Sequence, residues 1–145
     1  MAEFEESTAT PAPIAGALLI GAGVVHLCTA LMHGGFVMLG LGMVAVDPEI
    51  HRDPDALPLV TGVLLCFLVP DVVSSAVGAL QGVFGLRARQ IGPSSLSLAV
   101  ALLGVLWPMC RVVMDVLTCQ CTTFVLYLPP MLVSLGAVVF ITRRE

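Results

Sequence analysis

The sequence predicts an all-α integral membrane protein whose four helices form an antiparallel, up-down bundle. The chain of 145 residues is 58% hydrophobic and only 11% charged, whereas about 25% of the residues in a typical soluble domain are charged. Its mean hydropathy is +1.04. Three runs contain no charged residue, namely residues 7–46, 90–110 and 116–142. Each run exceeds the roughly 20 apolar residues that a membrane-spanning helix needs.

The first predicted helix covers residues 14–46 and begins after two prolines, which are tolerated where a helix starts. It is longer than one membrane crossing. The Gly34-Gly35 pair leaves two alternatives, a continuous helix or a short re-entrant break, and we expect the continuous helix. Residues 1–13 form a short acidic tail. Because this tail has no basic residue, we do not expect a cleaved signal peptide.

The second predicted helix, residues 57–86, follows an acidic loop at residues 47–56 and carries Pro70 and Asp71 near its middle. A turn at residues 87–93 connects it to the third helix.

The third predicted helix covers residues 94–117. Ser94 or Ser95 can cap it by accepting a hydrogen bond from a free backbone N–H. A turn at residues 118–123 leads to the fourth helix, residues 124–141. The Pro129-Pro130 pair lacks two N–H donors, so we expect a kink or a late start there.

Arginine placement predicts the orientation of the four helices. Arg87 and Arg89 lie in the second turn, and Arg143 and Arg144 follow the last helix. An even number of spans places all four on one side, opposite the acidic loop. Since basic residues favour the cytoplasmic side, we expect cytoplasmic N and C termini in a plasma or inner membrane.

Three ionisable residues lie within the predicted spans: Asp71, Arg111 and Asp115. A charge at the bilayer centre costs about 2.5–3.5 kcal/mol on insertion scales, so such residues face the bundle interior and pair. Counted from the ends of their helices, Asp71 and Arg111 lie within about 3 Å of each other in depth. We therefore predict an Asp71–Arg111 salt bridge, either as a structural pair or as part of a proton or ion pathway.

His26 and His33 share one face of the first helix with Thr29. The two histidines are separated by about 10 Å along the helix, which is too far for one metal ion. No other predicted span contains a histidine that would complete a haem site. We expect no metal and no other cofactor, and we expect both histidines to join the charged residues in a buried polar cluster.

Small residues recur at helical spacing on the second and third predicted helices. In lipid, such residues allow helix backbones to approach closely. The stripes predicted to pack against neighbouring helices consist of Ser74, Gly78 and Gly82, and of Ser97, Ala101 and Gly104.

The chain has five cysteines. Cys119 and Cys121 lie in the last turn, where a disulfide would link them to each other or link one of them to Cys110. Membrane thiol oxidoreductases with four helices use C-x-x-C rather than this C-x-C spacing, so redox catalysis is a distant alternative. We expect Cys28 and Cys66 to be small buried core residues.

Known catalytic signatures do not occur in the sequence. There is no G-x-S-x-G, phosphate-binding loop, H-E-x-x-H or glycine-rich dinucleotide fingerprint, so we predict no enzyme. A nucleic-acid partner is not expected either, because the chain has no basic patch.

The layout resembles that of small tetraspan membrane proteins. The glycine-rich stretch at residues 78–89, followed by a helix that opens with serine, is similar to uncharacterised four-helix bacterial membrane proteins. The order of loops is also similar to the membrane-spanning four-domain proteins of animals. This resemblance implies a non-enzymatic membrane protein able to oligomerise, and it implies no site residue.

Two functions remain open from the sequence. The first is a non-catalytic protein that packs, within the lipid bilayer, with itself or with a membrane protein partner. The second is a small proton- or cation-coupled transporter that uses the intramembrane charged residues.

Overall fold

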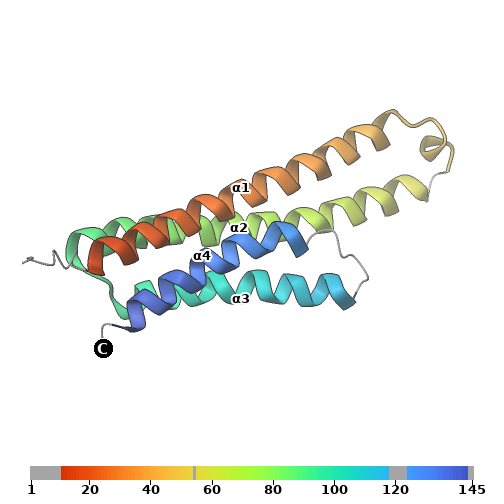
Figure 1. Ribbon diagram of the computed structural model, residues 1–145. Coiled ribbons are helices and arrows are strands. Elements are labelled where there is room, and N and C mark those ends of the chain that lie inside the picture. Colours follow the sequence, from red (N-terminus) through yellow and green to blue (C-terminus); the bar gives the residue numbers. More distant parts are fainter. Residues whose placement is uncertain (1–10, 54, 118–123, 144–145) are drawn as a thin grey trace, which may run out of the picture.

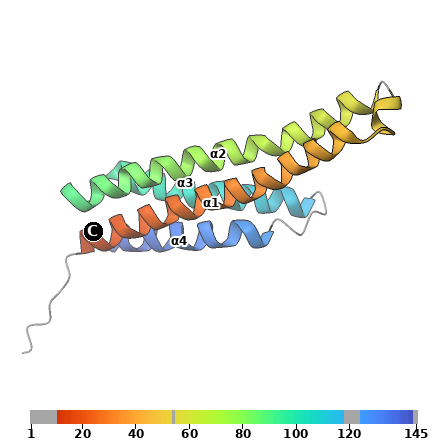
Figure 2. The same ribbon diagram turned by 90° about the horizontal axis from the view of Figure 1, so that it is seen from above.

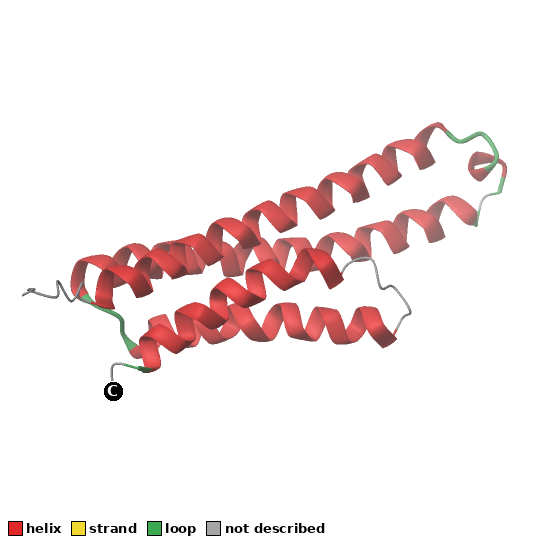
Figure 3. Cartoon of the chain, viewed as in Figure 1, coloured by secondary structure: helices red, strands yellow, loops and turns green. Residues whose placement is uncertain are grey.

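The computed structural model describes residues 11–53, 55–117 and 124–143, and helices account for nearly all of them. The elements are α1 (Pro11–Val46), the short 3₁₀ helix η1 (Ile50–Arg52), α2 (Ala56–Ile91), α3 (Ser95–Leu117) and α4 (Phe124–Thr142). No strand occurs in the described ranges (Figure 3). The predicted all-α four-helix bundle is confirmed. By length and composition, each helix is apolar enough to cross a membrane.

The four helices run antiparallel to their chain neighbours (Figure 1). One end of the bundle holds the start of α1, the α2–α3 connection and the end of α4. We call it the basic end, because Arg87, Arg89 and Arg143 are exposed there. The opposite, acidic end is the α1–α2 connection, where Asp47, Glu49, Asp53 and Asp55 lie.

The first two helices are much longer than the last two. α1 and α2 contain 36 residues each, whereas α3 contains 23 and α4 contains 19. At 1.5 Å per residue, the α1–α2 hairpin is about 54 Å long, and α3 and α4 are about 35 and 29 Å long. Figures 1 and 2 show that the hairpin projects past the ends of α3 and α4 at the acidic end.

The connection between α2 and α3 is shorter than predicted. Residues 87–91 belong to the last turns of α2 rather than to a turn. Gly92 ends the helix with φ 89°, a left-handed conformation that favours glycine, and its N–H donates to Ala88 O at 3.0 Å. Ser94 then caps α3 as expected, because its Oγ accepts a hydrogen bond from the Ser97 N–H at 3.3 Å.

Two other local expectations concern α1 and α4. The α1 helix is continuous through Gly34-Gly35, as predicted. The α4 helix begins at Phe124 and includes both Pro129 and Pro130, so the late start is wrong.

Glycine pairs bring α1 and α2 into close contact at two levels. Gly16 faces Gly85, and seven residues further along α1, Gly23 faces Gly78. A Cβ on Gly23 would lie 2.5 Å from the Gly78 carbonyl oxygen, and a Cβ on Gly85 would lie 2.8 Å from the Gly16 carbonyl oxygen. The backbones therefore approach as closely as small residues permit in membrane helices.

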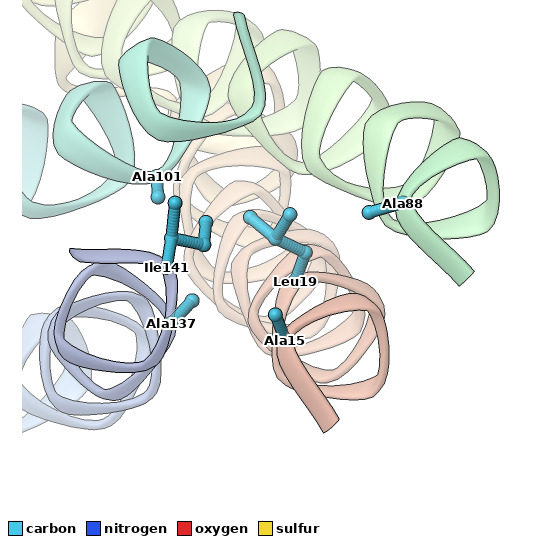
Figure 4. Close-up of a cluster of buried hydrophobic side chains, with 6 residues drawn as sticks. All are labelled: Ala15, Leu19, Ala88, Ala101, Ala137 and Ile141. Carbon is cyan, nitrogen blue, oxygen red and sulfur yellow. The ribbon is translucent and has the colours of Figure 1, made fainter. Parts of the chain in front are cut away.

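A layer of apolar side chains fills the bundle at the basic end (Figure 4). Leu19 and Ile141 are its only large members, and four alanines from the four helices surround them: Ala15, Ala88, Ala101 and Ala137. Beyond this layer, toward the acidic end, the buried side chains include polar ones such as His26, Gln81 and Asp71.

Candidate functional site

One face of α1 supplies three buried polar side chains to the bundle interior. His26, Thr29 and His33 are spaced three and four residues apart and are at most 9% exposed. Each contacts a different helix, so this face is the common partner of α2, α3 and α4.

His26 bonds to α3 at a proline. Its Nε2 lies 3.2 Å from the Gly104 carbonyl oxygen. Pro108, four residues later, has no N–H to donate to that carbonyl within the helix. Because a carbonyl oxygen only accepts, His26 Nε2 donates, and the histidine replaces the missing helical hydrogen bond.

Thr29 plays the same role on α4. Its Oγ1 donates to the Leu126 carbonyl oxygen at 3.3 Å, and Pro130 is the residue whose missing N–H leaves that carbonyl free. Prolines persist in membrane helices when a neighbouring helix satisfies the released backbone group. The polar face of α1 therefore compensates prolines on two helices.

His33 pairs with Asp71 of α2. Its Nδ1 lies 2.9 Å from Oδ1 and 3.0 Å from Oδ2 of the carboxylate, and both side chains are nearly buried. Asp71 directly follows Pro70, so this contact also falls at a proline position. The bond becomes a full ion pair when the imidazole is protonated.

The predicted Asp71–Arg111 salt bridge is therefore wrong, because each of the two residues has a different partner. Asp71 pairs with His33, and Arg111 lies against Asp115 of its own helix, with 3.3 Å between Nε and Oδ1. The depth estimate failed because α2 continues to Ile91. The five additional residues move Asp71 roughly 7 Å further from the basic end than the sequence suggested.

Tyr127 of α4 completes the charged group. Its side chain is fully buried and interacts electrostatically with Arg111, Asp71 and Asp115. Tyr127 therefore lies within electrostatic range of the charged residues of α2 and α3, where α3 ends and α4 begins.

The interior also contains hydrogen bonds between polar side chains that the sequence analysis did not predict. Gln81 Nε2 donates to Ser134 Oγ at 2.9 Å, and the Trp107 indole N–H donates to Ser74 Oγ at 2.9 Å. Gln81 is the one amide side chain within the predicted second span, and that isolated polarity was a usable signal. Ser134 had no comparable signal.

The predicted packing residues divide into two groups. Ser74, Gly78, Ser97, Ala101 and Gly104 are buried between helices. Gly82 is different, since a Cβ there would meet nothing within 4 Å.

The cysteines differ from expectation. Cys28 and Cys66 are exposed rather than buried, and Cys110 is exposed with a free thiol. Cys119 and Cys121 lie outside the described residues, so the predicted disulfide stays a prediction.

The polar groups form a line along the bundle axis, which we call the polar line. It begins at the His33–Asp71 pair, continues through Ser74 and Trp107, and ends at the level of His26 and Gln81. The apolar layer of Figure 4 closes it toward the basic end. In the described part of the chain, no group of three or more His, Cys, Asp or Glu residues is placed to hold a metal ion.

Comparisons of the chain with protein-family models, with curated protein sequences and with solved structures find no match. The class of protein therefore follows from its own residues. The length and composition of its four helices fit a multi-pass membrane protein with a polar interior.

Proposed function

We propose that the protein is a non-catalytic multi-pass membrane protein that works by packing against a second copy of itself in the bilayer. In this proposal both termini are cytoplasmic, since Arg87, Arg89 and Arg143 share one end of the bundle.

The uncovered face of α1 carries this proposal. Cys28, Gly35 and Gly42 are exposed and seven residues apart, and a Cβ on either glycine would meet nothing within 4 Å. On its other face, α1 uses the same spacing at Gly16 and Gly23 to contact α2. A repeated small-residue spacing is the arrangement through which membrane helices associate.

The projecting hairpin supports the same conclusion. Beyond the ends of α3 and α4, the described residues give α1 and α2 no α-helical neighbour other than each other, with the short η1 between them (Figure 1). Large apolar side chains at the end of α1 are exposed, including Met43 at 68% and Val46 at 78%. Self-association would cover part of this surface.

Native cysteines give a direct test of self-association. Cys28, Cys66 and Cys110 are exposed on α1, α2 and α3. Three variants, each with one of these residues as the sole cysteine of the chain, would be oxidised in membranes. Monomers and covalent dimers would then be separated by size without reductant. We expect a covalent dimer from the Cys28 variant and little from the Cys110 variant. Equal, weak cross-linking of all three would contradict the α1 interface.

A second candidate function is proton- or cation-coupled transport. The observation that favours it is the polar line, which pairs His33 with Asp71 and is closed on one side by Leu19 and Ile141. Ionisable residues inside membrane bundles mark such pathways. The test is proton uptake into liposomes that contain the protein and a trapped pH-sensitive dye. Transport predicts uptake that Asp71→Asn abolishes, and uptake equal to that of empty liposomes would exclude proton transport.

A further inference from the structure

The polar line ends in a layer to which every helix contributes one polar group. These groups are His26 of α1, Gln81 of α2, the Gly104 carbonyl of α3 and Ser134 of α4. The three side chains have 0% exposure. We call this set the central layer.

Two atoms of the central layer accept hydrogen bonds but have no donor. Because His26 Nε2 donates to Gly104 O, the neutral ring presents a lone pair at Nδ1. Gln81 Nε2 donates to Ser134 Oγ, and the amide oxygen Oε1 of Gln81 takes no part in that hydrogen bond. Neither His26 Nδ1 nor Gln81 Oε1 has a hydrogen-bond partner among the described residues. Burying such acceptors without a donor is unfavourable, more so within a membrane.

The close glycine contacts bring these two side chains together. At the Gly23–Gly78 crossing, Gly78 lies beside the His26 Cβ and Gly23 lies beside the Gln81 Cβ. The Gln81 amide then lies directly over Gly104, at a place that any Cβ on Gly104 would occupy. His26 bonds to the carbonyl of the same Gly104. Both side chains therefore converge on one residue of α3.

We propose that the central layer is a binding site for one small hydrogen-bond donor, a water molecule that donates to His26 Nδ1 and Gln81 Oε1. The Ser134 hydroxyl, which accepts from Gln81, still has its own proton to donate to the water oxygen. Such a water has three polar partners, the usual number for a buried water.

The chemistry of the layer favours a neutral occupant. An imidazole lone pair, an amide oxygen and a hydroxyl carry no net charge, and the layer contains no carboxylate or thiolate to balance a metal cation. The polar residues Ser74 and Trp107 lie between this layer and the His33–Asp71 pair, so water enters from that side. Leu19 and Ile141 exclude it from the other. All of these groups belong to one copy of the chain, so the water site does not require self-association.

Nuclear magnetic resonance of the full chain in lipid nanodiscs tests the proposal. The histidine rings are labelled with ¹⁵N, the His26 signals are identified by their loss in His26→Leu, and magnetisation transfer from water protons to the ring is measured. We expect His26 as the Nε2–H tautomer, with a water cross peak. Absence of that cross peak in the wild-type protein would overturn the proposal, whatever the variants do.

A pair of glutamine variants tests the second ligand. Gln81→Met removes the amide oxygen while keeping an unbranched side chain, and Gln90→Met is the control because Gln90 is exposed on the same helix. We expect Gln81→Met to lose the His26–water cross peak and Gln90→Met to keep it. An unchanged cross peak in Gln81→Met would contradict the shared water. Replacement of the water signal by ammonium protons after ammonium chloride is added would identify a cation and overturn water as the occupant.

Discussion

Gly78 and Gly82 lie one helical turn apart on α2, and the structure predicts opposite effects when each is changed to alanine. A Cβ on Gly78 would lie 2.7 Å from the Gly23 carbonyl oxygen and 3.1 Å from the His26 Cβ. A Cβ on Gly82 would meet nothing within 4 Å. Gly78→Ala must therefore push α1 away from α2, whereas Gly82→Ala needs no movement.

The comparison isolates the packing contribution. Both substitutions gain about 1 kcal/mol of helix propensity, which cancels in the difference between the variants. Overpacking of a filled contact costs roughly 1–3 kcal/mol, and the Gly78 contact involves backbone that cannot rotate away. We expect Gly78→Ala to be less stable than Gly82→Ala by about 1–3 kcal/mol, with Gly82→Ala at least as stable as the wild type.

Reversible unfolding of the protein in mixed micelles of mild detergent and sodium dodecyl sulfate would measure this difference by helical circular dichroism. Equal stabilities of the two variants would refute the close α1–α2 crossing. A Gly82→Ala variant that is the less stable of the two would show that α2 is rotated from its position in the structure.

Three further predictions follow from the polar face of α1 and from the exposed thiols. Pro108→Ala restores a helical N–H donor to Gly104 O, so His26→Leu is expected to destabilise the Pro108→Ala protein less than it destabilises the wild type. Equal destabilisation in both backgrounds of this double-mutant cycle would contradict the role of His26 as the donor that replaces the helical hydrogen bond. Thr29→Val removes the donor to Leu126 O and is expected to cost about 0.6 kcal/mol, the average for interhelical hydrogen bonds in a membrane protein, and at most about 1.7 kcal/mol. A neutral result in the same unfolding assay would argue against that bond. Cys28 and Cys66 are expected to react with a lipid-soluble maleimide in the folded protein, whereas labelling only after unfolding would place them in the core.

The interior face of α3 was predictable because that helix is amphipathic. Its small and polar residues recur at spacings of three and four, and Ser97, Ala101, Gly104, Pro108 and Asp115 are indeed buried. The other helices are apolar nearly all round, so the period of the pattern carries little information about which face turns inward. Cys28 and Cys66 were misplaced for this reason, since a lipid-facing and a core-facing position have similar neighbours.

Partner choice within the interior depends on helix ends and rotations that the sequence determines only loosely. Ending the second helix at Leu86 placed Asp71 level with Arg111, whereas the observed end at Ile91 removes that match. Asp71 then contacts α1, which the glycine pairs hold close. Gln81 was not predicted to face the interior, because the neighbouring stripe of small residues, which includes Gly82, indicated a different contact face.

Measuring the pairing of His33 with Asp71 tests the interior arrangement most directly. This pair joins α1 to α2, and it replaces the Asp71–Arg111 salt bridge that the sequence predicted. A double-mutant cycle with His33→Gln, Asp71→Asn and the double variant measures the coupling through unfolding in mixed micelles. With both carboxylate oxygens within 3.0 Å of Nδ1 in a buried site, we predict a coupling of at least about 1 kcal/mol. Additive effects of the two substitutions would contradict the pairing and the interior arrangement built on it.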